Sequence, residues 1–123
     1  MNIQISGKVI HGDSYGRVLG FPTANLDRRD YLKRKLKLKF GVYAGKAMTL
    51  GKEYRAGITI GPLDNKGLPK LEAHLLGFKG NLYGKKLTMV VVKYLRPWMN
   101  FPSEQALKKQ IARDLIKVKK IKN

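Results

Sequence analysis

The sequence predicts a mainly β domain, a small antiparallel barrel or sandwich with one α-helix at its carboxyl end. Three observations support this prediction. Short segments of alternating or β-branched apolar residues recur along the chain, and turn-forming clusters such as GPLDNKG and GNLYG separate them. Only the carboxyl end carries a long helical repeat. Because no helix alternates with the strands, a parallel βαβ sheet is not expected.

The first strand candidate is Asn2–Ile10, where Ile3 and Ile5 share one face before a turn signal at residues 11–13. Leu36, Leu38 and Phe40 alternate with lysines, which is typical of a strand with one wet face. We expect this segment to continue into the next candidate after a break at a glycine. The later candidates are Gly41–Met48, Tyr54–Ile60, Lys70–Phe78 and Lys86–Leu95.

The helix is expected at about residues 103–119. Pro102 provides a stop, Ser103 is an N-cap candidate, and Glu104 suits the first turn of the helix dipole. Apolar residues then recur at helical spacing, namely Leu107, Ile111, Leu115 and Val118.

The composition limits the class of protein. The chain has 123 residues with 43% apolar content, which suits a single domain over residues 1–123 with one modest core. It has no cysteine, so disulfides and thiolate metal sites are excluded. The amino end lacks the pattern of a signal peptide, and the longest aliphatic run, Met89–Val92, cannot span a bilayer. We therefore expect a soluble cytoplasmic protein, taken as a monomer, with no membrane partner.

The formal net charge of +18 favours polyanionic partners such as nucleic acids or nucleotides. The lysines are spread along the chain, however, and aromatic residues are not interleaved with them as base-stacking platforms would require. Nucleic acid is therefore not the expected partner. A small basic β-barrel that binds nucleic acid without catalysis stays open as an alternative.

The loop HGDSYGRVLG carries Gly12, Gly16 and Gly20 at a spacing of four. Such glycines let the backbone turn sharply and present amides to an anion, and Arg17 can add a charged donor to a phosphate. On spacing alone, an ordinary surface loop between strands explains the segment as well.

The segment FPTAN follows that loop. In an extended chain Thr23 and Asn25 project on the same side, and their neutral hard oxygens can bind a Mg²⁺ that takes its other ligands from phosphates and water. The alternative is a proline-initiated turn in which both side chains bind nearby backbone groups.

The segment LEAHLL places Glu72 and His74 on one face of a strand. A carboxylate that points into a barrel mouth can take a proton from a hydroxyl nucleophile, whereas an exposed glutamate would have no such role. Together the three candidates combine phosphate binding, a hard cation and a base, which is the chemistry of phosphoryl transfer.

These motifs, in this order, resemble the riboflavin kinase family, which also forms the carboxyl-terminal module of bifunctional bacterial FAD synthetases. The matching blocks are GKVIHGDSYGRVLGFPTANL, GVYAG, EAHLLGF, LYGKKL and YLRP followed by NFPS. The resemblance implies a six-stranded antiparallel Greek-key β-barrel with a terminal helix. It also implies the reaction of ATP with riboflavin to give ADP and FMN.

The resemblance implies roles for individual residues. Thr23 and Asn25 match the residues that bind Mg²⁺ and the nucleotide phosphates, and Glu72 matches the acid taken as the catalytic base. The mobile loop over the nucleotide is matched by Gly12, Gly16 and Arg17. The flavin site is matched by Leu95, Arg96, Phe101 and Ser103, together with the start of the helix.

Three departures from the family pattern concern peripheral contacts. They are Ser14 and Tyr15 in the glycine loop, the segment 62–69, and Gly77 where the family often has aspartate. A kinase-like barrel that has lost its activity and only binds flavin is a further alternative. The sequence alone leaves open whether the chain is a monofunctional kinase or a fragment of a bifunctional synthetase.

Overall fold

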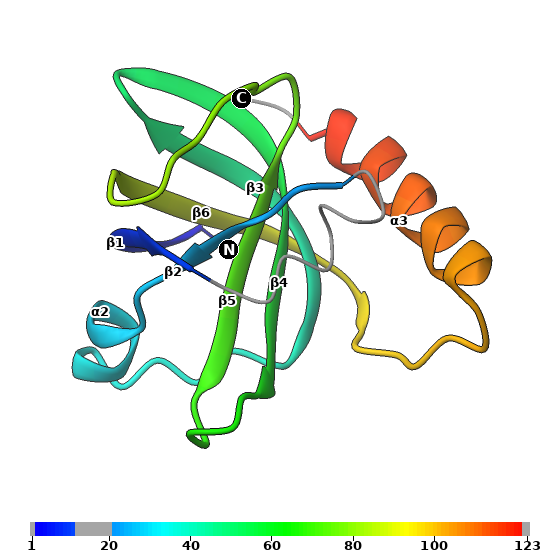
Figure 1. Cartoon of the computed structure of the whole chain (residues 1–123), viewed down its shortest axis with the longest axis horizontal. Helices are drawn as coiled ribbons and strands as arrows, with labels where there is room; N and C mark the ends of the chain where they lie inside the picture. Colours follow the sequence, from blue (N-terminus) through cyan, green and yellow to red (C-terminus); the bar gives the residue numbers. More distant parts are fainter. Residues whose placement is uncertain (1, 12–20, 122–123) are drawn as a thin grey trace.

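The computed structural model describes residues 2–11 and 21–121. Within them, six antiparallel strands close into a barrel, and a long helix lies against its outside (Figure 1). The strands are β1 (Ile3–Ile10), β2 (Ala24–Leu26), β3 (Gly41–Thr49), β4 (Lys52–Leu63), β5 (Pro69–Leu75) and β6 (Lys86–Pro97). The helices are the short α2 (Arg29–Lys33) and the long α3 (Glu104–Lys119).

The strand order around the barrel is β1-β2-β5-β4-β3-β6, and β6 closes the ring by pairing with β1. Strands β3, β4 and β5 follow one another as hairpins, and β6 returns to lie beside β3. This arrangement is a Greek key. The predicted fold class, a six-stranded antiparallel barrel with a carboxyl-terminal helix, is therefore confirmed.

Alternation along each strand divides the barrel interior from its surface. On β5, Leu71, Ala73 and Leu75 are buried, whereas the intervening residues are only partly buried. The core inside the barrel contains Ile5, Leu26, Ile58, Ile60, Leu87, Met89 and Val91, all at most 1% exposed. Because the interior of this small barrel is filled by side chains, ligand sites are expected on its outside.

The prediction of a strand at Leu36–Phe40 is wrong. The chain leaves helix α2 through Lys35, whose φ is 53°, and the backbone N–H groups of Leu36 and Leu38 then donate to the carbonyl and hydroxyl oxygens of Tyr31. Both leucines still pack against the core, which explains the apolar alternation without a strand. Helix α2 is not among the elements predicted from the sequence.

The expected break at Gly41 is where β3 begins. Its φ of 153° is unfavourable for residues with a side chain, and a Cβ there would lie 2.3 Å from the carbonyl oxygen of Arg96. Glycine at this position therefore lets β3 approach β6 closely.

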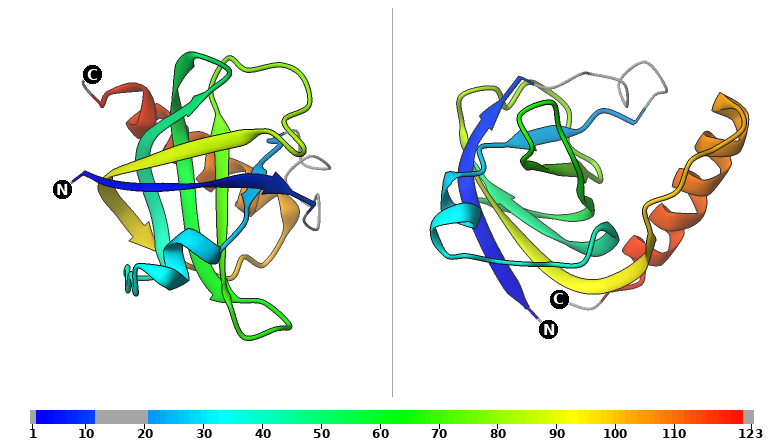
Figure 2. Two further views of the ribbon diagram at one scale, coloured as in Figure 1. Left: turned by 90° about the vertical axis from the view of Figure 1, so that its left-hand side faces the viewer. Right: turned by 90° about the horizontal axis from the view of Figure 1, so that it is seen from below.

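Helix α3 begins directly after Ser103, whose hydroxyl accepts from the N–H of Ala106 at 3.1 Å, so the predicted N-cap is confirmed. The end of the helix packs on the barrel through Val118, which forms a small cluster with Ala44 and Ile121. Figure 2 shows the beginning of α3 standing farther from the barrel than its end. In the described part of the chain, no helix has the length and apolar character needed to cross a membrane.

Candidate active site

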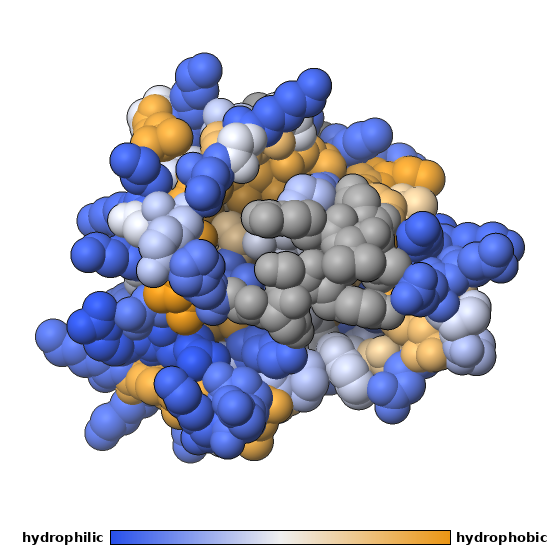
Figure 3. Space-filling view, viewed as in Figure 1, coloured by the Kyte–Doolittle hydropathy of each residue, from blue (hydrophilic) through white to orange (hydrophobic). Residues whose placement is uncertain are grey.

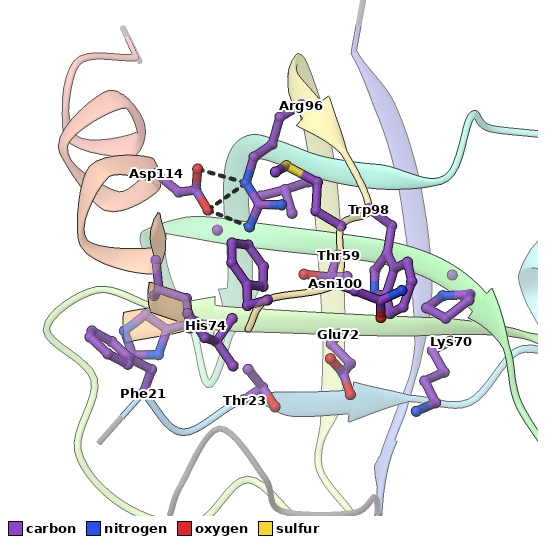
Figure 4. Close-up of a pocket in the computed structure, with 18 of the residues that line it drawn as sticks. Phe21, Thr23, Thr59, Lys70, Glu72, His74, Arg96, Trp98, Asn100 and Asp114 are labelled. Carbon is purple, nitrogen blue, oxygen red and sulfur yellow. Dashed lines mark hydrogen bonds and ion pairs between the residues drawn. The ribbon is translucent and has the colours of Figure 1, made fainter. Parts of the chain in front are cut away.

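A cavity of about 570 Å³ lies between the barrel and the beginning of α3, and we call it the helix-side cavity (Figure 4). Its lining includes the aromatic and aliphatic residues Phe21, Trp98, Phe101, Leu107 and Ile111, with polar groups from Thr23, Thr59, Glu72 and His74. The size and the mixture of aromatic walls with a few polar groups suit a small organic ligand.

A second cavity, also of about 570 Å³, opens beside the turn between β4 and β5, and we call it the turn-side cavity. Its lining is more polar and includes His11, Asn25, Arg28, Asp64 and Asn65. Amide, imidazole and guanidinium groups are the donors that bind phosphate oxygens.

Two residues of β5, Lys70 and Glu72, line both cavities. They lie two positions apart on a strand, so they share a face, and Figure 4 draws the Glu72 carboxylate between the side chains of Thr23 and Lys70. Glu72 also pairs in register with Asn25 of β2 on one side and with Thr59 of β4 on the other. The carboxylate therefore lies where the two cavities meet.

The segment before β2 is held against β5 by His74. Its Nδ1 lies 2.6 Å from the carbonyl oxygen of Pro22, and its ring contacts Phe21 edge to face. This contact places Thr23 in the wall of the helix-side cavity, while Asn25, two residues on, lines the turn-side cavity. The predicted pair Thr23 and Asn25 therefore flanks the region of Glu72.

The described residues contain no group of three or more His, Cys, Asp or Glu side chains placed to hold a metal ion. A divalent cation bound here would rely on the neutral oxygens of Thr23 and Asn25 and on ligands brought by a nucleotide. Mg²⁺ accepts that mixture because it usually keeps phosphate and water ligands. The donor set fits Mg²⁺ and does not fit a transition metal.

The far wall of the helix-side cavity is fixed by an ion pair between β6 and α3. The Arg96 guanidinium donates to both carboxylate oxygens of Asp114 at 2.9–3.1 Å (Figure 4). Gln110 donates to the same carboxylate at 3.1 Å. The two charged side chains are only 14% and 6% exposed. The guanidinium also lies over the ring of Phe101.

The wall of the turn-side cavity is fixed by Asp64. Its carboxylate accepts from the backbone N–H groups of Leu68 and Lys66 and from the guanidinium of Arg28 at 2.7 Å. These hydrogen bonds lower the pKa of Asp64 from 3.8 to about 2, with the largest effect from Leu68, then Arg28, then Lys66. Asp64 belongs to the segment 62–69, which departs from the family pattern. Its bond to Arg28 therefore ties this segment to the chain just after β2.

The structure places the other predicted site residues as follows. Arg96, Phe101 and Ser103 line the helix-side cavity, whereas Leu95 lines neither cavity and packs in the cluster under α3. Gly12, Gly16 and Arg17, together with Ser14 and Tyr15, lie outside the described residues.

Several lining residues were not predicted as site residues. Lys70 has a signal in the sequence, because it stands two positions before Glu72 and so shares its strand face. Phe21, Trp98 and Leu107 have no comparable signal, since aromatic and aliphatic residues in a sequence do not distinguish a cavity wall from a core.

Known proteins resemble this chain over nearly its whole length. The family model Flavokinase, described as riboflavin kinase, matches residues 1–122. Proteins named bifunctional riboflavin kinase/FMN adenylyltransferase are similar in Escherichia coli strain K12, with 42% identity over 89% of this chain, and in Buchnera aphidicola subsp. Schizaphis graminum, with 39% identity over 97%. The chain spans only 35% and 38% of those two proteins.

Two solved structures share the fold. Riboflavin kinase from Trypanosoma brucei has a TM-score of 0.73 and 26% identity, with 96% of this chain and 78% of that one covered. A structure named as a macrolide-efflux protein from Streptococcus pneumoniae has a TM-score of 0.84 and 26% identity, with 97% of this chain and 39% of that one covered. Both similarities extend over the barrel and the helix.

Proposed function

The chain belongs to the riboflavin kinase family, and we propose that it transfers the γ-phosphoryl group of ATP to the ribityl 5′-hydroxyl of riboflavin, giving FMN and ADP. The proposal concerns this kinase reaction only, because the chain spans about a third of its bifunctional relatives. A cytoplasmic location and a monomeric state stay predictions.

The position of Glu72 is the observation that carries the proposal. Transfer between two substrates needs a base within reach of the hydroxyl at the point where the substrates meet. Glu72 is a partly buried carboxylate in the walls of both cavities, and it faces Asn25 across the β2–β5 ladder. We assign it as the general base.

The helix-side cavity is proposed to hold riboflavin. An isoalloxazine ring is flat and largely apolar with polar edges, and Trp98 and Phe101 offer aromatic surfaces beside polar groups such as Asn100. A ring held there directs the ribityl chain toward Thr23 and Glu72.

The turn-side cavity is proposed to hold ATP. Arg28, His11 and Asn65 supply donors, and the net charge of +18 attracts a nucleotide that carries several negative charges. This attraction is general rather than local, because the lysines are spread along the chain. Figure 3 shows many hydrophilic side chains on the visible face, with hydrophobic ones between them.

In the proposed reaction, the oxygen of the ribityl 5′-hydroxyl forms a bond to the γ-phosphorus while Glu72 takes the proton of that hydroxyl. The bond from that phosphorus to the bridging oxygen breaks, and ADP leaves with the bond's electrons. Thr23 and Asn25 are the residues that would hold Mg²⁺, which supplies charge neutralisation for the phosphates when bound. Glu72 carries the proton until solvent removes it after FMN leaves.

The test is to incubate the chain with riboflavin, ATP and Mg²⁺ and to follow FMN by chromatography. FMN that accumulates in proportion to enzyme supports the proposal. Flavin binding without turnover would indicate instead a degenerate flavin-binding module. Affinity for nucleic acid that falls steeply with salt, without FMN, would favour the basic-barrel alternative.

A further inference from the structure

We propose that Lys70 is a ligand of the γ-phosphate and tracks this group during transfer. The inference rests on the proposed kinase function and goes beyond it, because it assigns a cation to the reaction centre itself.

Lys70 lies at the boundary between the two cavities. It precedes Glu72 by two residues on β5, which puts their Cα atoms about 7 Å apart with both side chains on the outer face of the barrel. Figure 4 shows the two side chains extending in the same direction, toward β2. Lys70 is partly buried, and it lines both cavities together with the proposed base.

The arginines that line the cavities are fixed to the walls. Arg28 is bonded to Asp64 at 2.7 Å, and Arg96 is bonded through two nitrogens to Asp114. These bonds hold the guanidinium groups where they stabilise a turn and a helix. Arg28 can therefore meet a ligand only in the turn-side cavity and Arg96 only in the helix-side cavity, whereas Lys70 lines both cavities.

A lysine suits a group that moves. During transfer the phosphorus leaves the oxygen of ADP and approaches the ribityl oxygen, so its outer oxygens shift between the cavities. The Lys70 ammonium has three donors on a flexible stem, and it can follow these oxygens without a change in the backbone. It also offsets negative charge close to where Glu72 must act. It donates hydrogen bonds only and transfers no proton.

The test compares nucleotides that differ in the γ-phosphate. We expect Lys70→Met to weaken binding of the Mg²⁺ complex of the β,γ-imido analogue of ATP by about 10- to 100-fold, as for loss of a charged hydrogen bond, and binding of Mg²⁺–ADP much less. Isothermal titration calorimetry measures both affinities without turnover. Lys70→Arg should recover part of the loss, because it keeps the charge.

Lys66→Met is the matched control. Lys66 is exposed in the turn between β4 and β5 and lines neither cavity, so this variant removes one positive charge nearby without touching the site. We expect the affinity for either nucleotide to change by less than about threefold, because only the long-range electrostatic attraction of one lysine is lost. Circular dichroism of each variant checks that the barrel is folded.

Lys70 could instead act only through the charge of Glu72. Repeating the Lys70→Met comparison in a Glu72→Gln background separates the two roles, because a direct phosphate ligand keeps its effect there. An effect that vanishes in that background, or equal losses for ADP and the analogue, would overturn the inference. A wild-type chain that binds both nucleotides but forms no FMN would contradict the proposed function and leave the nucleotide comparison intact.

Discussion

Asn25 of β2 and Glu72 of β5 are directly paired residues of neighbouring antiparallel strands. Residues in this relationship have Cβ atoms about 5 Å apart on the same face of the sheet. A proposed metal ligand and a proposed base are thus held next to each other by main-chain pairing. The spacing between them depends on the barrel and not on a loop.

Glu72→Gln should lower kcat by on the order of 10²- to 10⁴-fold, because glutamine keeps the shape of the side chain but cannot accept the proton. Affinity for the ATP analogue should change little. Stopped-time assays of FMN and calorimetric titration measure the two quantities. Full activity in this variant would remove Glu72 from the mechanism.

Asn25→Ala should raise the Mg²⁺ concentration needed for half-maximal activity by about 10- to 100-fold, because an oxygen ligand of the metal is lost. Asn65→Ala is the control for loss of a proposed ATP donor, since Asn65 lines the same cavity but lies on the turn rather than opposite Glu72; it should raise KM for ATP more than the Mg²⁺ requirement. Titrations of activity with Mg²⁺ at fixed ATP measure the effect. Equal shifts in the two variants would contradict a metal role for Asn25.

Asp114→Asn should lower the free energy of unfolding by about 3 kcal/mol, because it leaves the buried Arg96 guanidinium without its charged partner. It should also raise KM for riboflavin more than KM for ATP, since Arg96 and α3 form a wall of the helix-side cavity. Urea unfolding and steady-state kinetics measure these changes.

Asp27→Asn is the comparison for that variant. Asp27 pairs with Arg29, whose side chain is 85% exposed, so its loss should cost no more than about 1 kcal/mol. Similar losses of unfolding free energy in the two variants would contradict a larger contribution from the buried Arg96–Asp114 pair.

Asp64→Asn should change how stability depends on pH. The pKa of Asp64 is lowered to about 2 in the folded chain from an ordinary value of 3.8. The carboxylate therefore stabilises the fold fully above about pH 4, and this contribution is lost as the pH falls toward 2. The variant should be less stable than wild type at pH 7, and the difference should shrink between pH 4 and pH 2. Urea midpoints across this range measure it, and a constant difference would contradict the assignment.

The fold was predictable because each barrel strand has one buried face. The alternation on β5 correctly separated Leu71, Ala73 and Leu75 from Glu72 and His74. The same rule failed at Leu36–Phe40, where Leu36 and Leu38 are packed by a loop that is bonded to Tyr31. Apolar alternation reports which side chains are buried, and it does not report whether the backbone finds a strand to pair with.

The candidate site was predictable only in part. Thr23, Asn25 and Glu72 carry distinctive chemistry, and the β2–β5 register pairs Asn25 with Glu72. The bond from His74 to Pro22 and the pairing of Arg96 with Asp114 depend on contacts across 52 and 18 residues of chain. Local patterns contain no information on such contacts. The flavin contact of Arg96 stays a prediction, and the bond from Arg96 to Asp114 has no signal in the sequence.

The two walls of the helix-side cavity differ in how their backbones are held. Strand β5 is hydrogen-bonded to β2 on one edge and to β4 on the other, whereas residues 98–103 lie outside every helix and strand. Amide hydrogens of β5 should therefore exchange with solvent orders of magnitude more slowly than those of residues 98–101. Riboflavin binding should slow exchange chiefly in residues 98–101, which would make that segment the entrance and leave the proposed base on a strand that is paired on both edges.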